Sequence, residues 1–319
     1  MATGSGKRIA YDQLSSLPHG IEGCAWGVWG ADDEVGAFND VGREEVLAAL
    51  ATVRTGDVFA LSWNLRLPEP ALYGRGPLRH TVRDDGFGMD DHLDGFYPQA
   101  SSQWDSLAHF AHPVHRFYGG RPSSELKGPG ARNGIDNLAR RGIVGRFVLA
   151  DLDRWRRRQG RPIDHDGGEP IALDDLTRCL SAQGSTVRHG DVLLVRFGWI
   201  TWYEGLSTAV RKDFADNSWS FKAAGIAPDA QVPRWLWDSG VVAVVADNVS
   251  FEALPFDPRG QSLHANLISL LGMPIGEMWA LDALAEDCAR DGRYEGLLMS
   301  APLYLTGGTG STANAVAVK

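Results

Sequence analysis

Apolar residues follow two kinds of spacing along the chain, and these spacings predict alternating helices and strands. Apolar side chains recur at helical spacing over 40–53 and again over 173–183. Near-continuous apolar runs at 192–197 and 240–247 predict buried strands instead, because a strand covered on both faces has no polar side. The irregular alternation of the two patterns indicates a mixed α/β fold.

Shorter patterns add further elements between these. Strands are predicted at 58–67, 142–150 and 297–305, and helices at 228–236, 264–271 and 281–290. A charged linker over 153–166 contains Arg154, Arg156, Arg157 and Arg158, which we interpret as a solvated face. The glycine-rich segment 307–311 follows a predicted strand and has no helix after it, so it predicts a tight turn and no nucleotide cofactor.

Residues 68–98 show neither spacing and contain prolines, glycines, aspartates and isolated aromatic residues. A loop of this length within a compact domain is usually functional or disordered. We therefore expect one domain over 1–319, with an N-terminal extension over about 1–40 and a loop-rich insertion over about 68–98.

Composition excludes several classes of partner. The 319 residues carry a formal charge of −9 spread along the chain, so no basic face is available for nucleic acid. The three cysteines, Cys24, Cys179 and Cys288, lack metal or redox spacing and favour a reduced compartment. Residues 1–17 do not resemble a secretory signal, and no run of about 18 apolar residues could span a membrane, so a cytoplasmic protein without membrane contact is expected.

Polar chemistry is concentrated in the segment 98–115, which holds three of the nine histidines beside an aspartate and two glutamines. If this segment begins as a strand, Gln103 and Asp105 share one face, because alternate side chains point the same way. His109 could return toward that face after a turn. Such a group can hold a metal ion or move protons.

The C-terminal half offers partners for this segment. His264 and Glu277 are single ionisable residues in otherwise apolar stretches of sequence. With Asp105 they form a possible oxygen and nitrogen ligand set for a divalent ion. The remaining histidines of the segment, His112 and His115, are interpreted as surface residues of a loop.

The spacing of these polar residues matches a known motif. Gln99-Ala-Ser-Ser-Gln103-Trp-Asp105-Ser-Leu-Ala-His109 is in register with His-x-Gly-Thr-His-x-Asp-x-Pro-x-His. This motif marks the cyclase family that includes bacterial kynurenine formamidase and isatin hydrolase, and the chain resembles that family over nearly its whole length. The aspartate and the last histidine match, whereas glutamines replace both earlier histidines. Further matching segments are 26–33, 142–151, 191–199, 225–229, 272–277 and 307–311.

The resemblance implies a mixed α/β fold with a barrel-like central β-sheet flanked by helices, assembled as a homodimer or higher homo-oligomer. It implies that His109 acts as the acid or base beside Asp105, and that Gln99, Gln103 and Trp104 contact a small-molecule substrate. A divalent metal, zinc or manganese, would be held by Gln99, Gln103, Asp105, His264 and Glu277. Glutamine is a weaker zinc ligand than imidazole, so the two replacements favour harder ions.

Three functions remain open at this stage. The leading hypothesis is a hydrolase that opens an amide, imide or lactone bond in a small cyclic or aromatic carbonyl compound, with His109 as general base. The alternative is a metal-independent cyclase, lyase or isomerase of specialised metabolism, in which Gln99 and Gln103 donate hydrogen bonds to a developing oxyanion. A binding protein descended from an enzyme ranks last, because the ionisable residues of the motif are present.

Overall fold

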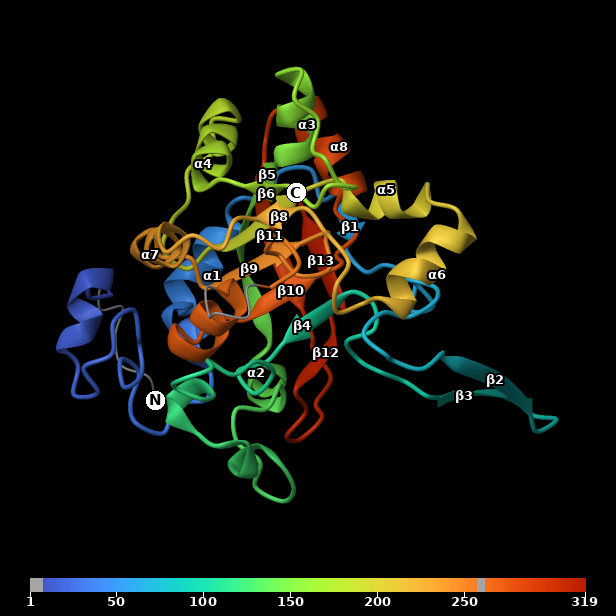
Figure 1. Ribbon diagram of the computed structural model, residues 1–319, viewed down its shortest axis with the longest axis horizontal. Helices are drawn as coiled ribbons and strands as arrows, with labels where there is room; N and C mark the ends of the chain where they lie inside the picture. The colour runs from blue at the N-terminus through green and yellow to red at the C-terminus, as the bar shows by residue number, and fades with distance from the viewer. Residues whose placement is uncertain (1–7, 257–261) are drawn as a thin grey trace.

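One nine-stranded sheet organises the computed structural model, which describes residues 8–256 and 262–319. The strands lie in the order β1-β13-β11-β5-β7-β9-β10-β4-β12 and curl into a half-barrel with helices around it (Figure 1). Their bounds are β1 (Val58–Ala60), β4 (Gln103–Asp105), β5 (Ile143–Asp151), β7 (Val192–Arg196), β9 (Ala243–Ala246), β10 (Ile275–Glu277), β11 (Glu295–Ser300), β12 (Gly310–Thr312) and β13 (Ala315–Val318). The predicted mixed α/β fold with a barrel-like sheet is confirmed.

The middle of the sheet is parallel and its two sides are antiparallel. β5, β7, β9 and β10 pair in parallel, whereas β4 runs antiparallel to both of its neighbours, β10 and β12. Every residue of β7 and β9 is buried, as expected for apolar strands covered on both faces. The strands predicted at 192–197 and 240–247 are therefore present, although β9 is shorter than predicted.

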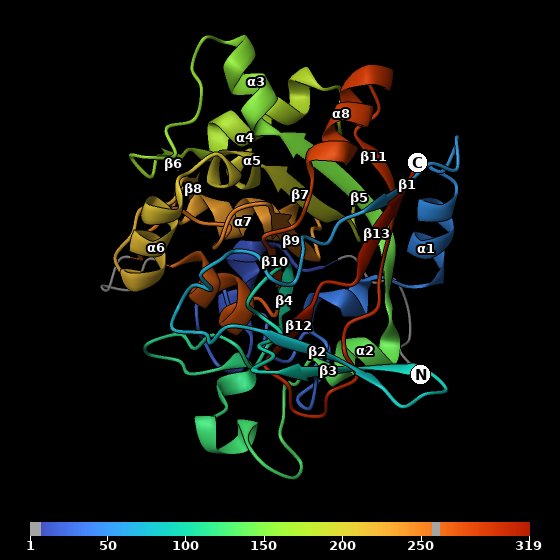
Figure 2. The same cartoon turned by 90° about the vertical axis from the view of Figure 1, so that its right-hand side faces the viewer.

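Helices cover the sheet, and α3, α4 and α8 gather at one end of it in both views (Figures 1 and 2). Helices at 173–183, 264–271 and 281–290 agree with the prediction, whereas α7 begins three residues after the predicted start at Pro228. The α-helices are α1 (Arg43–Leu50), α2 (Asp136–Arg141), α3 (Leu152–Arg158), α4 (Leu173–Ala182), α5 (Trp199–Glu204), α6 (Thr208–Asp216), α7 (Gln231–Asp238) and α8 (Asp282–Asp291). The 3-10 helices are η1 (Tyr11–Ser16), η2 (Gly36–Asp40), η3 (Tyr118–Gly120) and η4 (Ser123–Leu126), and η5 (Ala265–Leu270) is a π-helix.

Two predicted strands have the wrong length. The strand predicted at 58–67 ends at Ala60, since its pairing with β13 reaches Val316 opposite Ala60 and only the Leu61 N–H still donates, to the Ala315 carbonyl. The strand predicted at 297–305 is β11, which ends at Ser300. It is not the last strand, since β12 begins at Gly310, inside the predicted glycine-rich turn, and β13 follows it.

The insertion at 68–98 is not a plain loop. It contains a hairpin of β2 (Arg79–Asp84) and β3 (Met89–Asp94), which projects away from the body of the molecule (Figure 1). Every residue of both strands is exposed. Without a buried face the hairpin has no alternation of apolar and polar residues, which explains why its strands were not predicted. A second small pair consists of β6 (Pro170–Ile171) and β8 (Gly225–Ile226).

The arginines of 153–166 do not form a uniformly solvated face, which corrects the prediction. Arg156 on α3 is only 6% exposed and forms ion pairs with Glu169 and Asp175. A buried guanidinium needs such partners, because leaving water without them is costly.

The N-terminal segment packs on the body from residue 8 onward. The Tyr11 backbone N–H donates to Asp238, and the Trp237 indole donates to the carbonyl of Ile9, so this segment is fixed to α7. Residues 1–7 of the predicted extension lie outside the described residues. Among the helices that are described, none is both long and apolar enough to cross a membrane.

Candidate active site

β4 places its three side chains on alternating sides of the sheet. Gln103 and Asp105 face the same side, as predicted, and Trp104 faces the other. The Trp104 ring is fully buried 5.0 Å from the ring of Trp279, and its indole donates to Ser300 Oγ. Trp104 therefore lies in the core and outside the site, contrary to its predicted role in substrate binding.

Glu277 is brought to this face by strand pairing. β10 runs antiparallel to β4 in a register that sets Glu277 opposite Gln103. The Gln103 amide donates from Nε2 to Glu277 Oε2 at 2.6 Å and to Asp105 Oδ1 at 3.2 Å. Two oxygens in this buried group, Gln103 Oε1 and Asp105 Oδ2, have no hydrogen-bond partner among the described residues. A buried unpaired polar atom costs about 1–3 kcal/mol, so these oxygens indicate a site built for an external partner.

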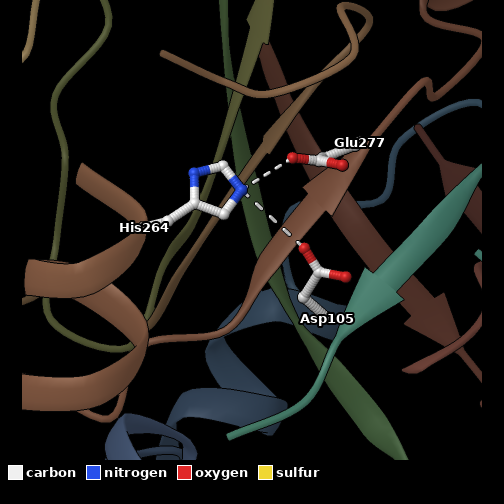
Figure 3. Close-up of side chains that lie close together, drawn as sticks. All are labelled: Asp105, His264 and Glu277. Atoms are coloured by element: carbon white, nitrogen blue, oxygen red, sulfur yellow. Dashed lines mark hydrogen bonds and ion pairs between the residues drawn. The ribbon is translucent and has the colours of Figure 1, made fainter. Parts of the chain in front are cut away.

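His264 lies immediately before η5 and joins the group through both ring nitrogens. Nε2 is 2.9 Å from Glu277 Oε1 and 3.9 Å from Asp105 Oδ2, and both carboxylates point toward the ring (Figure 3). Nδ1 lies 2.7 Å from Glu252 Oε1, which also accepts the backbone N–H of His264. Burial opposes the charged ring, but the hydrogen bonds and charges of Glu252 and Glu277 outweigh it and raise the pKa of His264 to about 10.

Gln99 connects His109 to Asp105. Its amide Nε2 donates to Asp105 Oδ1 and to His109 Nδ1, the latter at 2.9 Å, while Thr309 donates to its Oε1. Because the amide nitrogen can only donate, His109 Nδ1 holds the lone pair and the proton of the neutral ring lies on Nε2. His109 Nε2 is 3.6 Å from Asp105 Oδ1, so the predicted return of His109 to this face is present in the structure.

Burial shifts the acid–base behaviour of His109. Loss of hydration lowers its pKa most, the charges of His264 and Arg75 lower it further, and only Asp105 opposes these effects. A quarter of the side chain remains exposed, so the ring is open to a ligand as well as to its partners. A neutral imidazole in this position can accept a proton.

Aromatic rings border the cluster on one side. Phe110 and Phe256 lie 5.2 and 5.3 Å from the ring of His264, measured between ring centres. Tyr73 and the 79%-exposed Trp219 form a second pair at 5.4 Å. Such rings suit a flat, apolar ligand.

The structure brings together six of the predicted residues, namely Gln99, Gln103, Asp105, His109, His264 and Glu277. His112 and His115 are apart from them, as expected. They stack on one another at 4.7 Å in a turn closed by backbone hydrogen bonds between His112 and Arg116.

A divalent ion fits part of the predicted ligand set. Asp105, His264 and Glu277 each offer one ligand atom, and these atoms lie within 4.8 Å of one another. The unpaired Gln103 Oε1 adds an oxygen donor of the kind that hard ions accept. Gln99 does not fit the set, because its oxygen accepts from Thr309 and its NH₂ group faces the cluster.

Three contributors were not predicted. Glu252 orients His264, and Tyr73 and Arg75 lie at the edge of the site within the insertion. Glu252 is a single acidic residue in the mostly apolar stretch of sequence that follows the predicted strand at 240–247. The same signal identified Glu277, so Glu252 could have been predicted in the same way. No sequence signal separates Arg75 from the other arginines of the insertion.

Comparison with known proteins identifies the family of this chain. Residues 55–253 match the family model described as "Putative cyclase". The chain belongs to this family. A crystal structure described as that of a novel cyclase shares 33% sequence identity with this cyclase-family protein and superposes with a TM-score of 0.82. The match covers 93% of the present chain and 99% of the chain in the crystal structure.

More distant solved structures share the fold of this cyclase-family protein. Isatin hydrolase A from Labrenzia aggregata, bound to benzyl benzoate, has 17% identity and a TM-score of 0.59, covering 86% of this chain and 97% of its own. An isatin hydrolase bound to the product analogue thioisatinate has 16% identity and the same TM-score, and the match covers 88% of the present chain and 99% of the isatin hydrolase chain. The comparison with curated proteins gives no significant match.

Proposed function

We propose that this protein is a hydrolase that opens an amide, imide or lactone bond in a small cyclic or aromatic carbonyl compound. The observation that carries the proposal is the meeting of Asp105, His109, His264 and Glu277 around two unpaired buried oxygens. Similarity in fold to isatin hydrolases supports it. Release of carboxylate from a panel of lactones and cyclic amides, followed by chromatography, tests it, and absence of turnover across the panel would contradict it.

The residues of the site have different roles in the proposed reaction. His109 acts as general base and takes the proton of the attacking water at Nδ1, where it carries its lone pair. Asp105 Oδ1, close to Nε2, stabilises the imidazolium that forms. Before the water can approach Nδ1, Gln99 turns its amide away from this nitrogen and toward the substrate, where it donates a hydrogen bond to the developing oxyanion. The aromatic rings of Phe110 and Phe256 hold the substrate beside this pair.

A divalent ion bound by Asp105, His264 and Glu277 would supply Lewis acidity to the carbonyl and lower the pKa of water. We expect chelation to reduce turnover at least about tenfold and added zinc or manganese to restore it, because this set leaves positions open for exchange. Turnover should be measured beside elemental analysis of the same samples. Full activity in samples shown to be metal-free would contradict this prediction.

The dependence of kcat/KM on pH should report His109. The ring acts as a base only when neutral, which is above its pKa, and burial lowers that pKa from the ordinary value of about 6.5. We therefore expect activity to fall on the acidic side with a midpoint below that value. An acidic midpoint above about 7 in a rate profile from pH 4 to 9 would show that another group limits the reaction.

A second candidate is a metal-independent cyclase, lyase or isomerase of specialised metabolism. One observation favours it: both ring nitrogens of His264 already have carboxylate partners, so the cluster can close without an ion. His109 and Asp105 would then move the proton. Retained turnover with negligible metal content would select this candidate, and about one ion per chain that rises and falls with activity would select the hydrolase.

A further inference from the structure

Arg75 lies at the edge of the site, two residues after a non-glycine residue held in an uncommon backbone conformation. Its Nη1 donates to the carbonyl of Gln99, whose side chain holds Asp105 and His109. Its guanidinium carbon lies 5.2 Å from the ring centre of Tyr73. Tyr73 has a φ of 61°, which is strained for an aromatic residue. Strain of this kind persists where the surrounding structure enforces it and often marks functional sites.

Arg75 is not in an ion pair with any acid among the described residues, although its charge acts on Glu277 nearby. In the part of the chain that the structure describes, no carboxylate pairs with Arg75, whereas Arg146, Arg156 and Arg196 each pair with at least two. Within the same residues, its Nε and Nη2 have no hydrogen-bond partner, since the bond to the Gln99 carbonyl is made by Nη1. The guanidinium therefore keeps donors and a positive charge available beside the catalytic residues.

Arg75 also lines a cavity of about 290 Å³ between residues 65–78 and 95–101. The walls are largely apolar and include Pro68, Pro77, Leu78 and Phe96. Arg75 thus lies between the cluster of catalytic residues and an apolar space that could hold the remote part of a ligand.

We propose that Arg75 forms an anion subsite that binds a carboxylate carried by the substrate. This inference rests on the proposed function and narrows it, because the substrate is then an acidic aromatic or cyclic carbonyl compound whose apolar part extends toward the cavity. A guanidinium suits this role, since it can donate two parallel hydrogen bonds to one carboxylate.

Calorimetric titration with benzoate and with benzamide, its uncharged amide, tests the subsite directly. We expect the unaltered protein to bind benzoate at least about tenfold more tightly than benzamide, as charge-assisted hydrogen bonds allow. Arg75→Gln should lose this preference while still binding benzamide. Arg75→Lys should keep part of it, because an ammonium retains the charge without the paired donors. Arg83→Gln, on the exposed hairpin, is the matched control and should keep the full preference.

Equal affinity for the two probes, no binding of benzoate, or a full preference in Arg75→Gln would each overturn the subsite. The hydrolase proposal is tested separately, by measuring whether the unaltered protein turns over a neutral lactone. Turnover of that lactone without benzoate preference leaves the hydrolase standing and removes the subsite. Benzoate preference that depends on Arg75, with no turnover of any substrate, leaves the subsite standing and removes the hydrolase.

Discussion

Replacing His109 with alanine is expected to lower turnover about 10²–10⁴-fold, the range in which general acid–base groups contribute. The ring is held between Gln99 and Asp105, and burial lowers its pKa so that the neutral base is present at neutral pH. Alanine removes the proton acceptor and leaves the other polar groups of the cluster in place. Initial rates on the best lactone or cyclic amide of the panel measure the effect.

His112→Ala is the matched control for this substitution. His112 is three residues away in the chain but stacks on His115 in a separate turn, so its loss should leave turnover within about twofold. Equal activity in His109→Ala and the unaltered protein would count against both the hydrolase and the metal-independent alternative, because both assign the proton transfer to His109.

Replacing Trp104 with alanine should lower the free energy of unfolding by about 3–5 kcal/mol, the usual range for a buried large aromatic residue. The indole is fully buried, lies 6.2 Å from the ring of Phe38 and 5.0 Å from that of Trp279, and donates to Ser300. Urea unfolding followed by circular dichroism measures the change.

Trp219→Ala is the control for this substitution, because Trp219 is 79% exposed. We expect it to change the free energy of unfolding by no more than about 0.5 kcal/mol. A loss below about 1 kcal/mol in Trp104→Ala would show that the core around β4 re-forms without the indole. The position of Gln103 and Asp105 would then depend less on their neighbour in the strand than the structure indicates.

Local spacing was enough to predict the centre of the site. Strand alternation set Gln103 and Asp105 on one face, and four further residues returned His109 to them. The buried strands β7 and β9 were equally clear, because both faces of each are covered and the apolar run is unbroken. These features depend on neighbours in the chain, which the sequence displays directly.

Features that depend on distant contacts could not be predicted in this way. Glu252 reaches His264 across twelve residues of chain, and Arg156 is buried only because Glu169 and Asp175 meet it. Trp104 was assigned to the substrate from the family resemblance, although alternation in a strand sends it into the core. The family motif identified residue positions but did not fix which way the Gln99 amide points.

The two glutamines that replace motif histidines both donate to the same oxygen, Asp105 Oδ1. An amide neither gains nor loses a proton between pH 4 and 9, whereas imidazoles in these places would charge near neutrality. The two amide donors that hold Asp105 Oδ1 therefore keep the same charge across this range, and its other oxygen, Oδ2, faces the ring of His264 at 3.9 Å from Nε2 (Figure 3). In this chain the part of the motif that fixes a carboxylate is thus separate from the part that can accept a proton, which is the imidazole of His109.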